Sequence, residues 1–140
     1  MKDSIIILCG GGPAPGMNSV SMSVAKTFLS KGYRVIGLHG GYSGLFSKDA
    51  RIEDLDFSIA DRYFNRGGSY LEMSRFKPTD EDFEKRFNLD LFKDNNIKLL
   101  FFEQIHDKIA VCNIAAIELV VRFVFNRLQC LQITCISQQI

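Results

Sequence analysis

The sequence predicts an α/β fold in three layers, with a mainly parallel β-sheet and helices on both of its faces. Two short apolar runs, Ser4–Cys9 and Ile97–Phe102, are typical of strands that are buried on both sides. The first run is followed by a glycine loop, a helical pattern and another apolar run, all within about thirty-five residues. This order indicates a βαβ unit, whose crossover is almost always right-handed.

The segment Asn18–Lys31 is predicted to be the helix of this unit. Apolar residues recur along it with the helical period, at Val20, Val24 and Phe28. Gly32 stands where glycine commonly follows a helix C-terminus.

The next elements follow from similar local signals. Tyr33–Leu38 is predicted to be a strand, and Ser58–Asn65 a short helix with Ser58 as its N-cap. The stretch Arg66–Pro78 is rich in loop residues. Thr79–Asn95 opens with acidic residues and closes with a basic one, as expected of one helix aligned with its dipole.

After Phe102 the composition changes, so a boundary between residues 1–102 and a tail, residues 103–140, is expected. The tail contains neither glycine nor proline and holds three of the four cysteines. A helix is predicted over Ile105–Leu128.

The tail includes a largely apolar stretch, Ile109–Phe125, that could be taken for a membrane segment. It carries Asn113, Glu118 and Arg122, and a charged residue near a bilayer centre costs about 2.5 to 3.5 kcal/mol. A buried or amphipathic helix with an ion pair between Glu118 and Arg122 is therefore the preferred interpretation.

Composition bounds the remaining classes of function. The chain has 46% hydrophobic residues, 24% charged residues and a formal net charge of +1, which predicts no bulk attraction to nucleic acid or to an anionic membrane. The four cysteines and two histidines lack the spacing of a zinc site. No signal peptide is recognised, so reduced thiols and a cytoplasmic location are expected.

The loop "GGGPAPGMN" after the first predicted strand indicates contact with an anion. Without side chains, its backbone can approach phosphate, and the N–H groups at the start of the following helix favour negative charge. The alternative is a tight strand-to-helix turn with no ligand. The loop is neither a GxGxxG motif nor a Walker A motif, because it lacks the GK[ST] ending.

Four motifs together resemble 6-phosphofructokinases, in both the ATP-using and the pyrophosphate-using branches. They are "GGGPAPGMN", "GGYSGLF", "NRGGSYL" and "SRF", in the family's order, and the likeness runs from Ile5 to Phe102. The resemblance implies the Rossmann-like N-terminal part of the phosphofructokinase fold, truncated. Residues 1–102 would form a unit that binds the donor phosphate, followed by the divergent tail.

The resemblance also implies roles for individual residues. Gly12 would meet the donor phosphates through its backbone, and Tyr42 would line the nucleotide pocket. Arg75 and Phe76 would form a donor-site pair, with Arg75 stabilising charge on the transferred phosphoryl group. Without the resemblance, Tyr42 would be an ordinary half-buried aromatic residue and Arg75 a solvated one.

Other positions match less directly. Arg66–Gly68 matches the family motif, but a turn held by Asn65 and the glycines would explain it without a ligand. Met22 and Lys26 stand where bacterial enzymes carry an effector-binding arginine pair, so allosteric control by that route is not expected. Pro13 replaces an aspartate common in bacterial ATP users, which favours the pyrophosphate-dependent or atypical forms.

The strand Ile97–Phe102 leads, in the family, into a second glycine loop whose aspartate holds Mg²⁺. Here no glycine follows, and Glu103 and Asp107 are interpreted as a solvated helix start rather than as metal ligands. No metal ligand, catalytic aspartate or fructose 6-phosphate arginine is recognised. The resemblance implies Mg²⁺ with ATP or pyrophosphate, fructose 6-phosphate as acceptor, and a homo-oligomer, yet this chain alone is predicted to be inactive.

Three hypotheses follow from this combination. The chain is the N-terminal fragment of a 6-phosphofructokinase, a truncated module that binds phosphate or nucleotide, or a non-functional product. A shifted reading frame in an A+T-rich gene would account for the composition of residues 103–140.

Overall fold

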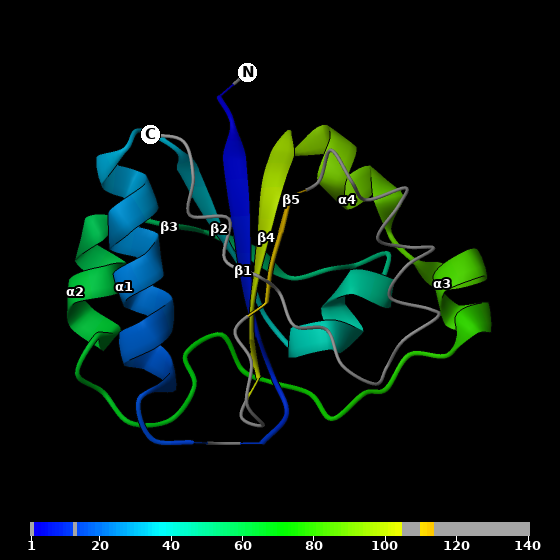
Figure 1. Cartoon of the computed structure of the whole chain (residues 1–140), viewed down its shortest axis with the longest axis horizontal. Coiled ribbons are helices and arrows are strands. Elements are labelled where there is room, and N and C mark those ends of the chain that lie inside the picture. The colour runs from blue at the N-terminus through cyan, green and yellow to red at the C-terminus, as the bar shows by residue number, and fades with distance from the viewer. Residues whose placement is uncertain (1, 13, 105–109, 114–140) are drawn as a thin grey trace.

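The computed structural model describes residues 2–12, 14–104 and 110–113 of the chain. They form one five-stranded sheet with helices on both of its faces (Figure 1). In chain order the elements are β1 (Ser4–Gly10), α1 (Met17–Ser30), β2 (Arg34–Leu38), the 3₁₀ helix η1 (Gly41–Phe46), β3 (Ile52–Leu55), α2 (Phe57–Tyr63), α3 (Asp80–Arg86), α4 (Leu89–Asp94), β4 (Ile97–Gln104) and β5 (Ala110–Asn113). Helices α1 and α2 cover one face, whereas η1, α3 and α4 lie on the other (Figure 1).

The sheet has the strand order β3-β2-β1-β4-β5, with β1 in the centre. β1 pairs in parallel with β2 and with β4, so these three strands end at the same edge. β3 and β5 are antiparallel additions at the two sides. The predicted α/β fold with a mainly parallel sheet is confirmed.

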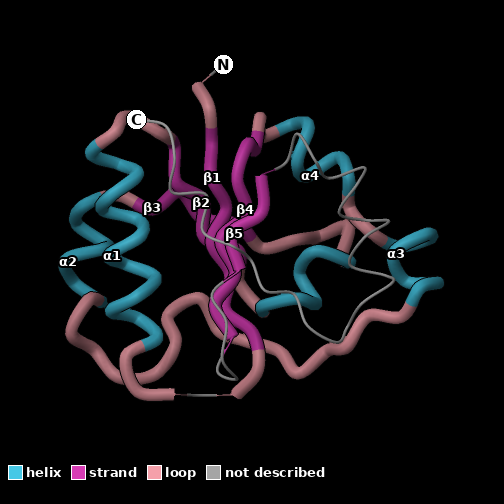
Figure 2. The backbone as a smooth tube through the Cα atoms, in the orientation of Figure 1, coloured by secondary structure: helices cyan, strands magenta, loops and turns pink. Residues whose placement is uncertain are grey.

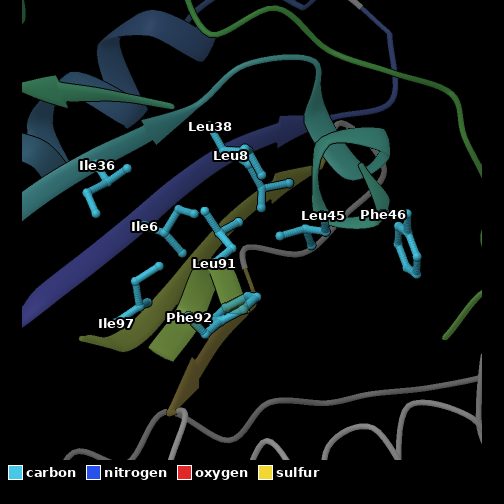
Figure 3. Packing of buried hydrophobic residues seen from close by; sticks show 9 residues of the cluster. All are labelled: Ile6, Leu8, Ile36, Leu38, Leu45, Phe46, Leu91, Phe92 and Ile97. Carbon is cyan, nitrogen blue, oxygen red and sulfur yellow. The ribbon is translucent and has the colours of Figure 1, made fainter. Parts of the chain in front are cut away.

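The core lies on both sides of β1, which explains why this strand carries no polar face. Ile6 and Leu8 join one cluster with residues of η1 and α4, shown in Figure 3. Ile5 and Ile7 join a second cluster under α1. Each fully buried side chain of this size contributes about 1.5 to 3 kcal/mol of transfer free energy, so both helical layers are held firmly to the central strand.

The helix predicted at Asn18–Lys31 is confirmed as α1, and Gly32 follows it with φ +87°. The short helix α2 is also present, but its predicted cap is wrong. The carboxylate of Asp56 accepts a hydrogen bond from the Ile59 N–H at 2.8 Å, whereas Ser58 lies inside the helix. Two residues able to cap a helix lie two positions apart here, and the earlier one, Asp56, has the extended backbone that a cap requires.

The single helix predicted over Thr79–Asn95 is wrong, because the structure forms α3 and α4 in its place. Thr79 does cap α3 in a capping box with Asp82, and hydrogen bonds from the backbone and side chain of Thr79 lower the pKa of that aspartate. The helix is interrupted at Phe87, whose backbone is extended while its ring packs on Phe46 at 5.6 Å. The side chain of Asn88 then caps α4.

The tail departs from its predicted helix at residues 110–113, where β5 pairs with β4. The rest of that prediction, including the pair Glu118 and Arg122, lies outside the described residues. β4 itself continues to Gln104, so Glu103 belongs to a strand and not to the predicted helix start. None of the helices within the described ranges is long and apolar enough to cross a membrane.

Candidate functional site

A glycine loop joins the carboxyl end of β1 to the start of α1. Gly11 and Gly16 have φ values of +85° and +86°, in the left-handed region that glycine adopts without strain. Gly16 is the N-cap of α1 and supplies no side-chain hydrogen bond. The first N–H groups of α1 therefore lack a side-chain cap, which suits them to bind an anion.

A second loop reaches the same edge of the sheet at Gly41, directly after β2. A Cβ atom on Gly41 would lie 2.4 Å from the carbonyl oxygen of Cys9 and 2.7 Å from the amide nitrogen of Ser74. Its φ is +59°. Only glycine can bring the backbone of this loop so close to the end of β1.

A third segment, Ser74–Phe76, lies alongside the glycine loop. Ser74 forms a parallel bridge with Gly10, and the Gly11 N–H donates to the Ser74 carbonyl at 3.2 Å. The loops after β1 and α2 run together along the lower edge of the sheet in Figure 2. Two of the motifs that the sequence singled out, separated by about sixty residues, are thus joined by backbone hydrogen bonds.

Arg75 projects its side chain over the glycine loop. Its Nη2 atom lies 3.4 Å from the position that a Cβ atom on Gly12 would occupy, and Nε lies 3.9 Å from it. The side chain is exposed, and it makes no hydrogen bond or ion pair with the part of the chain that the structure describes. A guanidinium that is free to donate, beside bare backbone, can bind two oxygen atoms of a phosphate at once.

Phe76 and Tyr42, the two predicted aromatic site residues, are both partly buried against the cluster of β1 and η1. The rings of Phe76 and Phe46 have centroids 5.3 Å apart. The Phe76 N–H donates to the Ser74 hydroxyl at 3.0 Å. Both aromatic residues therefore pack at the rim of the core. Phe76 directly follows Arg75 in the chain.

The turn at Arg66–Gly68 is held by Asn18, the last residue of the "GGGPAPGMN" motif, to which the sequence assigned no role. The buried Asn18 side chain donates to the carbonyls of Arg66 and Gly67 at 3.0 and 3.4 Å. It accepts from the Tyr70 N–H at 2.7 Å. The predicted role of Asn65 in this turn is therefore filled by Asn18, whose sequence signals are its place at the end of the glycine-loop motif and an amide in the first turn of a helix.

We expect the substitution Asn18→Ala to lower the free energy of unfolding by about 2 kcal/mol, because it removes the three hydrogen bonds that the buried Asn18 side chain makes to the backbone of the turn. Chemical denaturation would measure the change. Ser23→Ala on the exposed face of the same helix is the control, and it should stay within about 0.5 kcal/mol of the parent chain. Equal effects of the two substitutions would contradict the assigned role.

Met22 and Lys26, the two positions matching the effector-binding pair, both have structural roles on α1. Met22 is fully buried. Lys26 forms an ion pair with Asp61 at 2.5 Å, and its ammonium group lies 4.9 Å from the centroid of the Phe64 ring. Lys26 thus serves the contact between the two helices, and Met22 belongs to the buried interior.

Within residues 2–12, 14–104 and 110–113, no group of three or more histidine, cysteine, aspartate or glutamate residues is close enough to hold a metal ion. Pro13 and Asp107 lie outside these ranges. The described site therefore contains a glycine loop, a helix N-terminus and one guanidinium, which together can bind phosphate oxygens.

Comparison with known proteins gives consistent matches. The family model described as Phosphofructokinase matches residues 4–103. An ATP-dependent 6-phosphofructokinase of Edwardsiella ictaluri is 45% identical over 76 residues, covering 54% of this chain and 23% of that protein. A second one, from Aliivibrio fischeri, is 36% identical over 100 residues, covering 71% of this chain and 31% of its own length.

The fold is shared with a solved structure. The crystal structure of Pichia pastoris phosphofructokinase in the T-state matches with a TM-score of 0.64 and 24% identity, over 73% of this chain and 11% of that chain. This chain therefore spans less than a third of each of these relatives.

Proposed function

This chain belongs to the phosphofructokinase family, and on that premise we propose that its described residues form a site for the phosphoryl donor of a 6-phosphofructokinase. Gly12 would present its backbone to the donor phosphates, and Arg75 would bind and stabilise the phosphoryl oxygens. Tyr42 and Phe76 would border the nucleotide. The reaction of the whole enzyme would transfer a phosphoryl group to fructose 6-phosphate, forming fructose 1,6-bisphosphate in glycolysis.

One observation carries this proposal: the guanidinium of Arg75 lies within 3.4 Å of the space that a side chain on Gly12 would fill. A glycine at this point leaves room for an oxygen atom that any larger residue would exclude. The start of α1 lies at the other end of the same loop, and its dipole favours the same negative charge.

The donor is proposed to be ATP or pyrophosphate. The bacterial relatives are named as ATP-dependent enzymes, whereas the prolines of "GGGPAPG" favour the pyrophosphate users. Mg²⁺ would accompany either donor and screen its charge, but the described residues contain no cluster that fits a metal ion. No step on this chain is therefore assigned to the metal.

We further propose that this 140-residue chain alone does not phosphorylate fructose 6-phosphate. Phosphoryl transfer needs a positioned acceptor as well as a positioned donor, and only donor-site residues are recognised here. Residues 1–102 would be the donor-binding unit and residues 103–140 a divergent tail. We also propose that the protein is cytoplasmic and has no nucleic-acid or membrane partner. The whole enzyme would be a homo-oligomer.

Calorimetric titration with pyrophosphate and with ATP, each with and without Mg²⁺, tests the donor site. The substitution Gly12→Ala should weaken binding of the preferred donor by about tenfold, because its methyl group would occupy the space beside Arg75. Gly67→Ala is the matched control, since a Cβ atom there meets nothing within 4 Å.

The same titrations separate the alternatives. If either donor binds, and if Gly12→Ala weakens this binding while Gly67→Ala does not, the result supports a chain that binds phosphate by itself. No binding of either donor by the folded parent chain would overturn the proposed function. A coupled assay with fructose 6-phosphate, on protein free of host enzyme, tests the predicted lack of activity.

A further inference from the structure

A cluster of polar side chains connects the β2–β3 hairpin to the loop that carries Arg75. We call it the His39 cluster. Its members are His39, Arg51, Glu53, Tyr70 and Glu72. Tyr70 lies in the "NRGGSYL" motif without an assigned role, and the other four lie outside the motifs. Among the described residues, no hydrogen bond joins the cluster to Gly12 or Arg75.

The hydrogen-bond partners of His39 indicate which ring nitrogen accepts and which donates. Arg51 Nη2 lies 2.8 Å from His39 Nδ1, and His39 Nε2 lies 3.1 Å from Glu53 Oε2. A guanidinium only donates hydrogen bonds, so Nδ1 must be the acceptor. The single ring hydrogen is then on Nε2, which donates to the carboxylate of Glu53. The arrangement requires a neutral imidazole of defined tautomer.

The same Arg51 nitrogen also donates to the carboxylate of Glu72, and this hydrogen bond lowers the pKa of Glu72. Glu72 has φ +57°, in the left-handed region that a residue with a side chain rarely adopts. Its carbonyl accepts from the Ser69 hydroxyl at 3.1 Å. Arg51 therefore supports a strained backbone position that lies three residues before Arg75.

Tyr70 fastens the other end of the loop to the hairpin. Its hydroxyl lies 3.0 and 2.8 Å from the two carboxylate oxygens of Glu53. Burial, followed by the hydrogen bond to Glu53, raises the pKa of Tyr70 to about 12, so the hydroxyl keeps its proton and donates. The ring stacks on Tyr63 at 3.9 Å and meets the His39 ring edge-on at 5.7 Å.

We propose that neutral His39 is a positioning residue for the phosphate site, because it orients Arg51 to hold Glu72 and thereby fixes the loop that places Arg75 over Gly12. The proposal rests on the proposed donor site for its functional consequence. His39 itself contacts no phosphate and acts only through the loop.

Adding a proton to His39 would break its hydrogen bond with Arg51 and keep its hydrogen bond with Glu53. The protonated Nδ1 would face the Arg51 guanidinium as a second donor, so that hydrogen bond could not persist. The bond to Glu53 would remain as an ion pair. Among the described residues, the other ionisable groups near the ring are Tyr70, whose ring contacts the imidazole, and Glu72 and Asp49, which line the same surface hollow as His39. Arg51 would then hold Glu72 less firmly.

The first experiment measures pyrophosphate affinity of the parent chain and of His39→Gln at about pH 8 and about pH 5.5. Glutamine can donate to Glu53 but cannot gain a proton. Pyrophosphate itself gains protons in this range. The measured quantity is therefore the affinity of the parent chain divided by that of His39→Gln, compared between the two pH values. We expect the parent chain to lose about fivefold more affinity than His39→Gln on acidification. An unchanged ratio would overturn the proposal.

A second experiment reads the loop without any ligand. Nitrogen NMR should show the Nε2–H tautomer of the His39 ring at about pH 8. The ring signals are assigned to His39 because they are absent from the spectrum of His39→Gln. The protection of the Gly11 and Gly40 amides, which donate to Ser74 and Leu71, should fall on acidification in the parent chain and stay constant in His39→Gln. Lys85→Ala, which breaks an exposed ion pair on α3, should behave as the parent.

The two experiments distinguish a failure of the proposed donor site from a failure of the proposed role of His39. If pyrophosphate does not bind at all while the amides respond as expected, the donor site is wrong and the role of His39 in holding the loop stands. If the Nδ1–H tautomer is found, or if the amides respond equally in His39→Gln, the positioning role is wrong whatever binds at Gly12.

Discussion

Replacing Gly41 with alanine is expected to lower the free energy of unfolding by about 3 kcal/mol. Two costs add at this position. The backbone has φ +59°, and the new methyl group would lie 2.4 Å from the Cys9 carbonyl oxygen and 2.7 Å from the Ser74 amide nitrogen. Backbone atoms of two separate segments would have to move, and these segments form the edge of the proposed site. Chemical denaturation at equilibrium measures the loss.

Gly32→Ala is the matched control, because it shares the backbone strain without the crowding. Gly32 has φ +87°, and a Cβ atom there would meet nothing within 4 Å. We expect it to cost about 1 kcal/mol. Similar losses for the two substitutions would mean that conformation alone, and not the convergence of three segments, makes glycine necessary at position 41.

The substitution Arg75→Ala is expected to weaken binding of the phosphoryl donor by at least about tenfold, since a hydrogen bond to a charged group contributes about 1.5 to 3 kcal/mol. Arg75 has no partner among the described residues, so its removal should leave the free energy of unfolding nearly unchanged. Calorimetry with pyrophosphate and ATP, together with denaturation of the same samples, would measure both quantities.

Two further substitutions isolate the cause. Lys77→Ala removes the same charge from an exposed position two residues away, and it should change the affinity much less. Arg75→Lys keeps the charge but loses the planar fork, so it should recover only part of the lost affinity. Equal losses for Arg75→Ala and Lys77→Ala would indicate general attraction between the segment and phosphate, with no specific site.

Local patterns were sufficient to predict the central elements of the fold. β1, α1 and β2 are encoded by an apolar run, a 3.6-residue period and a glycine at the helix end, each of which acts over a few neighbours. The break between α3 and α4 was not predictable in this way. It depends on Phe87 packing against Phe46 in η1, far away in the sequence, which overrides the helical propensity of the stretch.

The tail illustrates the same limit. An apolar sequence without glycine predicted a helix, yet residues 110–113 pair with β4. Whether a short apolar run becomes strand or helix depends on the backbone partner that it meets. Only the arrangement of the sheet supplies that partner.

For the site, the motifs indicated Gly12, Tyr42, Arg75 and Phe76 through a resemblance, and their roles in binding remain proposals. The sequence could not show that Arg75 lies over Gly12, since the two are separated by α1, β2, η1, β3 and α2. It also assigned no role to Asn18, although this residue ends the "GGGPAPGMN" motif, or to His39, because an isolated histidine carries no recognisable pattern.

The sequence by itself determined the family, the central βαβ unit and the presence of bare backbone after β1, because these properties depend on neighbouring residues and on motif order. The tertiary structure alone decided which segments meet at the edge of the sheet. Gly41 touches Ser74, Asn18 holds the turn at Arg66, and His39 supports the loop of Arg75 through contacts across the fold. Such contacts form only when parallel strands end at one common edge, and no local pattern records their distances.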